Sequence, residues 1–169
     1  MARYFNITGE LTQQLLAAGD NANVSSVSLT NTDALHEGTV DLYIEKRTIG
    51  KFYLLKNVKI PAGVTLIHDL KGFNNKIGEF GLFIKLTKGT TFTLTGTIDP
   101  AASIIVPGSG TAFLSEVSIG DEIVVSGETR IVTLIASDTS LTVSAAFTDN
   151  SNDTTPDCNP VAPIDVILY

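Results

Sequence analysis

The chain has 169 residues, of which 43% are hydrophobic and 17% are charged, and its formal net charge is −7 at pH 7. This charged fraction is below the average for soluble domains, which excludes a fold built from long surface helices and favours strands joined by turns rich in Thr, Asn and Gly. No apolar run has the length of a membrane span, and the residues after Arg3 lack the apolar stretch of a signal peptide, so we expect neither a membrane anchor nor secretion.

Strand-like runs follow one another through the first half of the chain. The runs expected to form strands are 24–31, 39–45, 51–55, 80–86 and 90–95. Two further strands are expected, one on each side of a turn at residues 61–63. Within 39–45, apolar side chains alternate with Asp41, Tyr43 and Glu45, which predicts a strand with one buried face. Residues 12–18 fit a short helix or a strand equally well, so both interpretations stay open.

The second half of the chain has shorter runs at closer spacing. The runs expected to form strands are 104–106, 122–126, 129–136, 141–145 and 164–168. Short strands separated by turn residues are typical of a small barrel or sandwich. Apolar residues occupy both alternating sets of 131–135, which predicts a strand buried on both faces. Residues 149–160 are polar and turn-rich and are expected to form a loop.

Charge is distributed unevenly, and this indicates two modules. Residues 1–92 carry a net charge of +2, whereas residues 93–169 carry −9. The final run, 164–168, follows a loop with three prolines and has no turn leading back to the preceding strands, so we expect it to return to the first module. The predicted fold class is all-β: an antiparallel β-sandwich docking domain of residues 1–95 plus 162–169, with a small acidic β-barrel-like or β-sandwich domain of residues 96–161 inserted.

Two stretches carry recognisable motifs. They are VSSVSLTNTDALHEGTVDLYIEK, continuing through FYLLKNVKIPAGVTLIHDL, and GSGTAFLSEVSIGDEIVVSGETRIVTLIASDTSLTVSAAFT. Both resemble structural proteins of tailed-bacteriophage virions, of the head-decoration, neck and tail-fibre kinds, and together they cover over half of the chain. In such proteins the first motif belongs to a β-sandwich and ends in a hairpin. The second is more specific, and its order is matched by Gly110-Thr111, Phe113, Gly120-Asp121, Gly127, Val132 and Leu141-Thr142-Val143.

The resemblance implies a non-enzymatic virion structural protein that is assembled in the host cytoplasm. Its partners would be the major capsid protein or neck and tail proteins of the same particle, and it would form a homo-oligomer. A capsid decoration (cement) protein comes first, and a neck or tail attachment protein is the alternative. No cofactor, metal or partner-binding residue can be carried over. The acidic second module is a poor nucleic-acid surface, and we expect no membrane partner.

A carbohydrate- or receptor-binding module is the alternative from a different class. It predicts exposed aromatic rings beside paired polar groups. The absence of Trp weakens this interpretation, because sugar-binding surfaces often use flat aromatic rings.

Candidate catalytic residues are few, and we expect no enzyme. The two histidines are His36, beside a turn, and His68, which precedes Asp69. Neighbouring residues of a strand point to opposite faces, so His68 and Asp69 do not form a base with its orienting acid. Ser109 lies in a glycine-rich turn but lacks the G-x-S-x-G spacing of a nucleophile elbow.

Three further features are ambiguous. Asp149, Ser151 and Asp153 alternate as at the start of a calcium loop, but the later positions of an EF-hand are missing, so a solvated acidic loop is the default and an irregular calcium site the alternative. Cys158 has no zinc-ligand partner at suitable spacing and is either a surface thiol or a small buried side chain. Phe73, expected in a polar loop, either anchors a partner or packs on its own domain.

Overall fold

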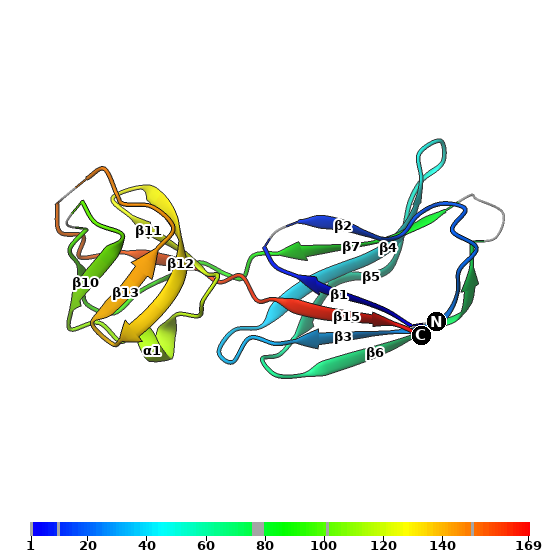
Figure 1. Cartoon of the computed structure of the whole chain (residues 1–169), viewed down its shortest axis with the longest axis horizontal. Helices are drawn as coiled ribbons and strands as arrows, with labels where there is room; N and C mark the ends of the chain where they lie inside the picture. Colours follow the sequence, from blue (N-terminus) through cyan, green and yellow to red (C-terminus); the bar gives the residue numbers. More distant parts are fainter. Residues whose placement is uncertain (1, 10, 76–79, 101, 150) are drawn as a thin grey trace. The chain divides into compact units, whose positions relative to one another are not determined.

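The protein folds into two compact units, seen in a computed structural model (Figure 1). The structure describes residues 2–9, 11–75, 80–100, 102–149 and 151–169 and confirms the all-β class. Unit 1 comprises Met1–Asp33, Glu37–Lys88 and Ala162–Tyr169, and unit 2 comprises Ala34–His36 and Gly89–Val161. Among the residues described, no helix combines the length and the apolar character needed to cross a membrane.

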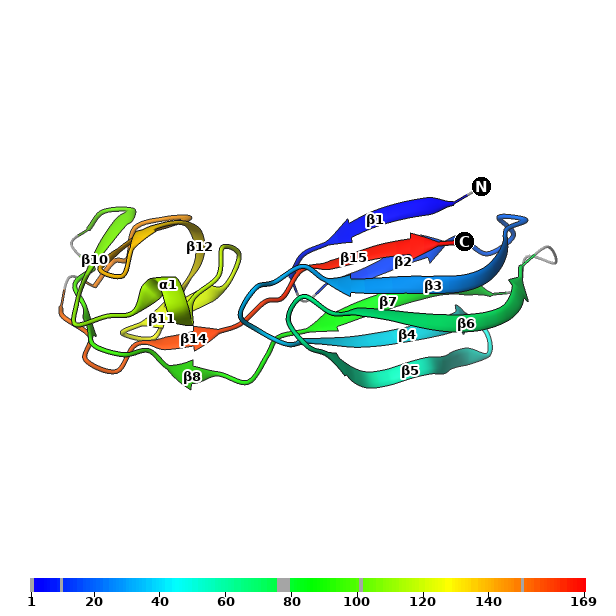
Figure 2. The same cartoon turned by 90° about the horizontal axis from the view of Figure 1, so that it is seen from below.

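Unit 1 is a sandwich of two four-stranded antiparallel sheets, which form two layers (Figure 2). We call the first the β15 sheet; its strands, in spatial order, are β1 (Arg3–Ile7), β15 (Ile164–Leu168), β3 (Asn23–Asn31) and β6 (Thr65–Asn74). We call the second the β4 sheet; its strands are β2 (Thr12–Leu16), β7 (Gly81–Thr87), β4 (Gly38–Lys46) and β5 (Gly50–Ile60). The C-terminal strand β15 therefore lies in the interior of its sheet, paired with β1 on one side and β3 on the other.

One apolar core lies between the two sheets. Inward side chains include Val27 and Leu29 of β3, Leu42 of β4, Ile84 of β7 and Val166 of β15, all fully buried. Each such aliphatic side chain contributes about 1.5–3 kcal/mol when it leaves water. The alternation of apolar and polar residues in β4 fixes which face of the strand is buried, because a shift of the register by one residue would expose its apolar side chains to solvent.

Residues 12–18, which fit helix or strand, form the strand β2 as far as Leu16. A register shift between Gln14 and Leu16 lets both Leu15 and Leu16 reach the core, although neighbours in a regular strand point to opposite faces. The paired leucines resemble a helical pattern in the sequence, and the irregularity explains how a strand can bury them.

The turn at residues 61–63 occurs where expected, with Gly63 at φ +68° and the Val64 N–H donating to the Pro61 carbonyl at 3.1 Å. It is not the hairpin that the resemblance implied, because β5 and β6 belong to different sheets. The turn instead carries the chain from the β4 sheet to the β15 sheet.

Unit 2 is a small curled sheet with one short helix. In spatial order its strands are β8 (Phe92–Thr93), β14 (Asp157–Asn159), β11 (Glu122–Val125), β12 (Glu128–Ser137), β13 (Ser140–Val143), β10 (Ile105–Ser109) and β9 (Thr97–Ile98). A bridge from Ile98 to Asp153 ties the last strand back to the segment before β14, so the sheet closes like a barrel around its core. The helix α1 (Phe113–Glu116) inserts Phe113 into that core.

The prediction that residues 131–135 are buried on both faces is wrong. Val132 is buried in unit 2, but Ile131 and Leu134 are among its exposed apolar side chains. The outer face of β12 is not covered by another layer in unit 2, and two register shifts against β13 bend the strand.

The division between the units begins earlier than residue 96. Phe92 and Thr93 of β8 pair with Cys158 and Asp157 of β14, so this segment belongs to unit 2. Gly89 donates its N–H to the Pro160 carbonyl at 2.8 Å, which holds the two segments that lead into and out of unit 2 side by side.

Candidate functional site

The outer face of the β4 sheet carries a row of three aromatic side chains. Strand register places Tyr43 of β4 opposite Phe83 of β7 on one side and Tyr53 of β5 on the other. The Tyr43 and Phe83 rings stack with centroids 5.5 Å apart, and the Tyr43 and Tyr53 rings lie 5.6 Å apart at a tilt of 54°. Tyr43 is only 2% exposed although it points away from the core, whereas Tyr53 is 46% exposed. The row is therefore a rigid platform with Tyr53 as its accessible end.

Two lysines extend along this aromatic row. Lys51 Nζ lies 4.6 Å from the Tyr43 ring centroid and 3.4 Å from the Tyr43 hydroxyl oxygen, and the hydrogen bond to Tyr43 raises the pKa of Lys51. Lys56 Nζ lies 4.3 Å from the Tyr53 ring centroid. Cations over ring faces are attracted by the negative π-surface, so both ammonium groups are held at the platform.

Asp41 organises the neighbouring part of β5. Its Oδ1 accepts the Asn57 N–H at 2.7 Å and its Oδ2 accepts from Lys56 Nζ at 2.6 Å. Asn57 has φ +51° and lies where the register of β4 and β5 shifts, so Asp41 fastens an irregularity in the ladder. Burial alone would raise the pKa of Asp41, but the bonds from Lys56 and Asn57 and the charges of Lys56 and Lys85 outweigh it, and the pKa is lowered.

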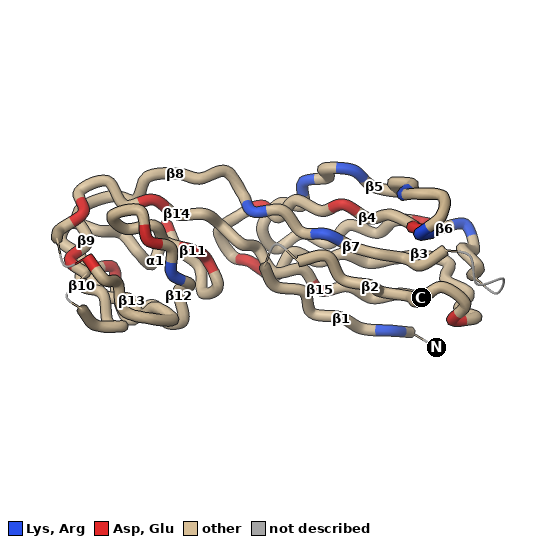
Figure 3. The backbone as a smooth tube through the Cα atoms, turned by 90° about the horizontal axis from the view of Figure 1, so that it is seen from above, with Lys and Arg blue, Asp and Glu red and all other residues tan. Residues whose placement is uncertain are grey.

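Basic residues exceed acidic ones over this face, and Figure 3 shows them along β5 and β7. The charged side chains on it are Lys51, Lys56, Lys59 and Lys85, against Glu37, Asp41 and Glu45. A cavity of about 410 Å³ opens beside Phe83, lined also by Gln14, Ala18, Glu45, Lys46, Arg47, Thr48 and Gly81. We call the aromatic row and its flanking lysines the aromatic–lysine face. It combines apolar area with positive charge.

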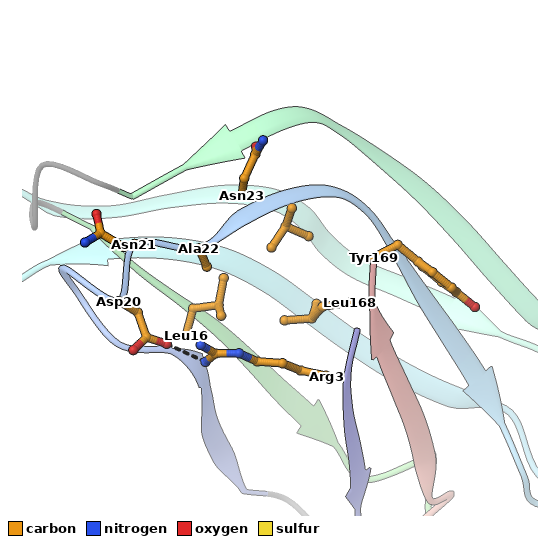
Figure 4. A pocket seen from close by; sticks show the side chains of 9 residues that line it. Arg3, Leu16, Asp20, Asn21, Ala22, Asn23, Leu168 and Tyr169 are labelled. Atoms are coloured by element: carbon orange, nitrogen blue, oxygen red, sulfur yellow. Dashed lines mark hydrogen bonds and ion pairs between the residues drawn. The ribbon is translucent and has the colours of Figure 1, made fainter. Parts of the chain in front are cut away.

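A second cavity, of about 330 Å³, lies at the end of the sandwich where β1 begins and β15 ends (Figure 4). Leu16, Val24 and Leu168 contribute its apolar side, and Arg3 forms an ion pair with Asp20 across it. Because the two charges satisfy each other, this cavity has no excess charge to attract an ionic ligand.

The candidate catalytic residues lie on separate elements. In unit 2, His36 has its Nε2 3.1 Å from the Glu116 carbonyl oxygen and its Nδ1 3.4 Å from Asp121 Oδ2. In unit 1, His68 and Asp69 are neighbours in β6, opposite Val27 and Ser26 of β3, and so alternate between faces of the strand. Ser109 ends β10 in unit 2, opposite Thr97.

The three ambiguous features also have definite places. Within the described part of the acidic loop, Asp149 Oδ1 accepts the Ser151 N–H, and the Asp153 carboxylate accepts the Ser126 and Thr155 N–H groups. These carboxylates therefore stabilise turns of the backbone, which favours the solvated loop over a calcium site.

The other two ambiguous residues, Cys158 and Phe73, both pack inside their own unit. Cys158 is fully buried in β14, so it is the small core side chain and not a surface thiol. Phe73 lies in β6, not in a loop, and packs against the core of unit 1, which removes the reason to assign it to a partner.

Sequence reasoning placed Tyr43 on the outward face of its strand but did not identify the aromatic–lysine face. The row depends on which strands flank β4, and β5 and β7 come from separate parts of the chain. Alternation within a strand shows a side chain's face but not its cross-strand neighbours. No family model, curated protein or solved structure matches this chain.

Proposed function

We propose that this chain is a non-enzymatic structural protein of a tailed-phage particle, with decoration of the head surface as its first role and attachment at the neck or tail as the alternative. The observation that carries the proposal is the aromatic–lysine face of unit 1. In this role it docks on an acidic protein surface of the particle, such as that of the major capsid protein.

The composition of the face suits protein binding. Aromatic side chains are enriched where protein interfaces are buried, because they offer a large contact area and lose little conformational entropy. Tyr43 is already fixed by Phe83, Tyr53 and Lys51, so a partner orders mainly Tyr53 and the lysine stems. Preorganisation of this kind lowers the entropic cost of association.

The charge of the face selects the partner. The face carries four lysines and three carboxylates, and three of the lysines are ion-paired with those carboxylates. The excess of one positive charge favours an acidic surface over a basic one. Only unit 1 offers lysines to an acidic partner. The one Lys or Arg residue of unit 2 is Arg130, and it bonds to Glu128. Binding is expected to weaken with salt, since exposed charges are screened.

Two further considerations support a structural role. The sequence motifs resemble virion proteins that have no catalytic residues. The histidines and Ser109 are placed on different elements, and His36 is oriented by a backbone carbonyl and a buried carboxylate. Such contacts suit a histidine with a packing role.

The test is rebinding of the purified chain to particles that lack it, with Tyr53→Ala and Lys59→Glu compared with Lys71→Glu. Tyr53 and Lys59 are exposed, so both changes leave the fold intact, whereas Lys71 lies on β6 of the other sheet. We expect each of the first two variants to lose at least about tenfold in affinity, because Tyr53→Ala removes an exposed aromatic contact and Lys59→Glu reverses a charge that faces the acidic partner. Lys71→Glu should bind like the wild type.

Copy number separates the alternatives within this proposal. Quantitative mass spectrometry of purified particles should give a count comparable to that of the major capsid protein for head decoration, and a dozen or fewer for a neck or tail position. If the chain is absent from the particle, the structural role is wrong.

One observation favours a second candidate, a carbohydrate-binding module. Phe83 lines the 410 Å³ cavity together with Gln14, Glu45 and Arg47, which places an aromatic ring beside polar side chains. Sugars stack on aromatic rings while their hydroxyls bond to such groups. A glycan array should then show binding that Phe83→Ala removes, and an array without hits would dispose of this candidate.

A further inference from the structure

The outer face of the β15 sheet differs in character from the aromatic–lysine face. Register places four residues in one row across all its strands: Tyr4 of β1, Ile167 of β15, Ser28 of β3 and Ile67 of β6. Figure 1 shows these strands side by side in that order. Tyr4 is 72% exposed and Ile67 is 69% exposed, while the small Ser28 is only 6% exposed. We call this the apolar row.

The adjacent row on the same face is polar but satisfied within the chain. Asn6 donates to Asp165 Oδ1 at 2.7 Å, and the Thr30 and Thr65 hydroxyls bond to each other at 2.9 Å. Over the two rows there is one carboxylate and no Lys or Arg. A partner that covers these two rows therefore removes few unsatisfied polar groups from water and meets one carboxylate of this chain. A second carboxylate, Asp69, lies in the next row, opposite Ser26.

We propose that a second copy of this chain covers the β15 sheet, face to face, about a twofold axis parallel to the strands. Such an axis brings β1 of each copy opposite β6 of the other, and β15 opposite β3. Tyr4 then meets Ile67 of the partner, and Ile167 meets the small Ser28 of the partner. The row is complementary to itself under this operation, which is the requirement for an isologous interface.

Charge supports a second copy over another partner. The second half of the chain is strongly acidic, and the aromatic–lysine face has one positive charge in excess on each copy, so neither surface favours contact with its own kind. The β15 sheet is the face of unit 1 on which two copies meet without placing like charges opposite each other. Asp165 would lie opposite Thr30 of the partner, whose hydroxyl can donate to it.

Size sets the expected strength. Strands lie about 4.8 Å apart and rise about 3.3 Å per residue, so the four-stranded face measures roughly 19 Å by 17 Å. This is smaller than the patch of about 800 Å² per partner in a standard stable interface. We therefore expect a reversible dimer with a dissociation constant on the order of 100 μM.

The first experiment is sedimentation velocity on the full chain from about 10 μM to about 1 mM, the range that brackets the expected constant. The wild type should approach twice its monomer mass. Ile67→Ser should weaken association at least about fivefold, because it removes an apolar contact at both ends of the row. Ile49→Ser is the matched control, since Ile49 is also an exposed isoleucine of unit 1 but lies in the turn between β4 and β5, and it should behave like the wild type.

The second experiment tests the register. Tyr4→Cys and Ile67→Cys proteins, mixed and treated with a short bis-maleimide, should cross-link to each other across stacked sheets that lie about 10 Å apart. Either variant alone should cross-link poorly, because like positions are displaced by three strand spacings, about 14 Å. Cys158 is fully buried, so the wild type is the blank for this reaction.

A mass that stays monomeric to the highest concentration overturns the proposal. So does a dimer that is indifferent to Ile67→Ser, or equal cross-linking in the mixture and in the single variants. These outcomes leave the proposed docking through the aromatic–lysine face untouched, because that face lies on the other sheet.

Discussion

At the scale of single residues, Asp121 holds together segments of unit 2 that are far apart in the sequence, and the residues around it do not predict this. Its Oδ2 accepts the Ser118 N–H and its Oδ1 accepts the Val161 N–H, both at 2.8 Å. It lies also near His36 Nδ1 and Cys158 Sγ, at 3.4 and 3.8 Å, and is fully buried. Gly120 and Asp121 stand directly before the run 122–126, which was expected to form a strand. Val161, which follows β14, could not have been foreseen as a partner, because a side chain's contacts forty residues away leave no local signal.

Asp121→Ala should destabilise unit 2 by about 2–5 kcal/mol, because two backbone donors lose their acceptor in a buried place. The reactivity of the sole thiol, Cys158, with a thiol reagent in increasing urea reports the opening of this unit, since that thiol is fully buried. Asp138→Ala is the control. The exposed Asp138 accepts the Leu114 N–H at the start of α1, where water can replace it, so its loss should cost about 1 kcal/mol or less. Equal losses for the two variants would contradict this account of Asp121.

Asp41 should make the stability of unit 1 depend on pH. Its pKa in the folded chain is lowered from the ordinary 3.8, so its contribution is present above pH 3.8 and is lost as pH falls through the folded-state pKa. All four tyrosines lie in unit 1, so tyrosine fluorescence follows the unfolding of this unit in urea. Asp41→Asn should lower the urea midpoint at neutral pH and flatten the loss below pH 3.8. An unchanged profile in Asp41→Asn would assign the acid sensitivity to other groups.

At the scale of elements, alternation and turn residues were sufficient to predict most strands and the all-β class, but not every short element. The strand 39–45 corresponds to β4 because its apolar positions alternate. The edge strand β1 was not expected, because Tyr4 and Asn6 face solvent and only Ile7 of this strand is fully buried. The helix α1 and the short strands β9 and β14 have too few residues to show a period, and β14 lies within 149–160, which was expected to form a loop.

Gly96 shows how closely the elements of unit 2 approach. Its φ is +84°, and a Cβ there would lie 2.5 Å from the Ser109 carbonyl oxygen and 2.6 Å from the Gly110 carbonyl carbon. Gly110 has φ +66° but open space around it. A left-handed backbone costs a side-chain-bearing residue about 1–2 kcal/mol, and both glycines share this cost.

Gly96→Ala should therefore destabilise unit 2 by about 2 kcal/mol more than Gly110→Ala, because only the first change forces two backbone segments apart. Urea unfolding followed through Cys158 reactivity measures both. If the two variants unfold at the same urea concentration, the steric contact of a Cβ at position 96 does not lower stability, and the cost of both changes comes from the positive φ alone.

At the scale of the whole molecule, each unit has its own core, and the chain passes into and out of unit 2 at neighbouring points. Gly89 and Pro160 are hydrogen-bonded there, and β15 then completes the first sheet. The acidic composition of the second half and the prolines before residue 164 pointed to such a layout. The position of the division could not be read from composition, because Phe92 and Thr93 resemble the strands that precede them and differ only in their partner.

Replacing residues 90–159 by Asn-Gly should leave unit 1 folded. The two connecting segments already lie side by side, so a two-residue turn closes the gap without moving β7 or β15. Tyrosine fluorescence should show a urea midpoint close to that of the full chain. Removing residues 162–169 from the full chain should instead abolish this transition, because β1 loses its neighbour and β3 loses one side of its ladder. A shortened chain that fails to fold would show that unit 1 depends on unit 2.

The pairing of β1 with β15 also bears on how the protein responds to force. Arg3 lies opposite Leu168, and the two strands run antiparallel, so their outer ends emerge from the same end of unit 1 (Figures 1 and 2). A pull that separates these two ends acts across the strands and opens their hydrogen bonds one after another, like a zipper, instead of loading the ladder in shear. Tension applied at the termini should therefore peel β1 away at low force, whereas load borne by the faces of the sandwich would spread over both sheets.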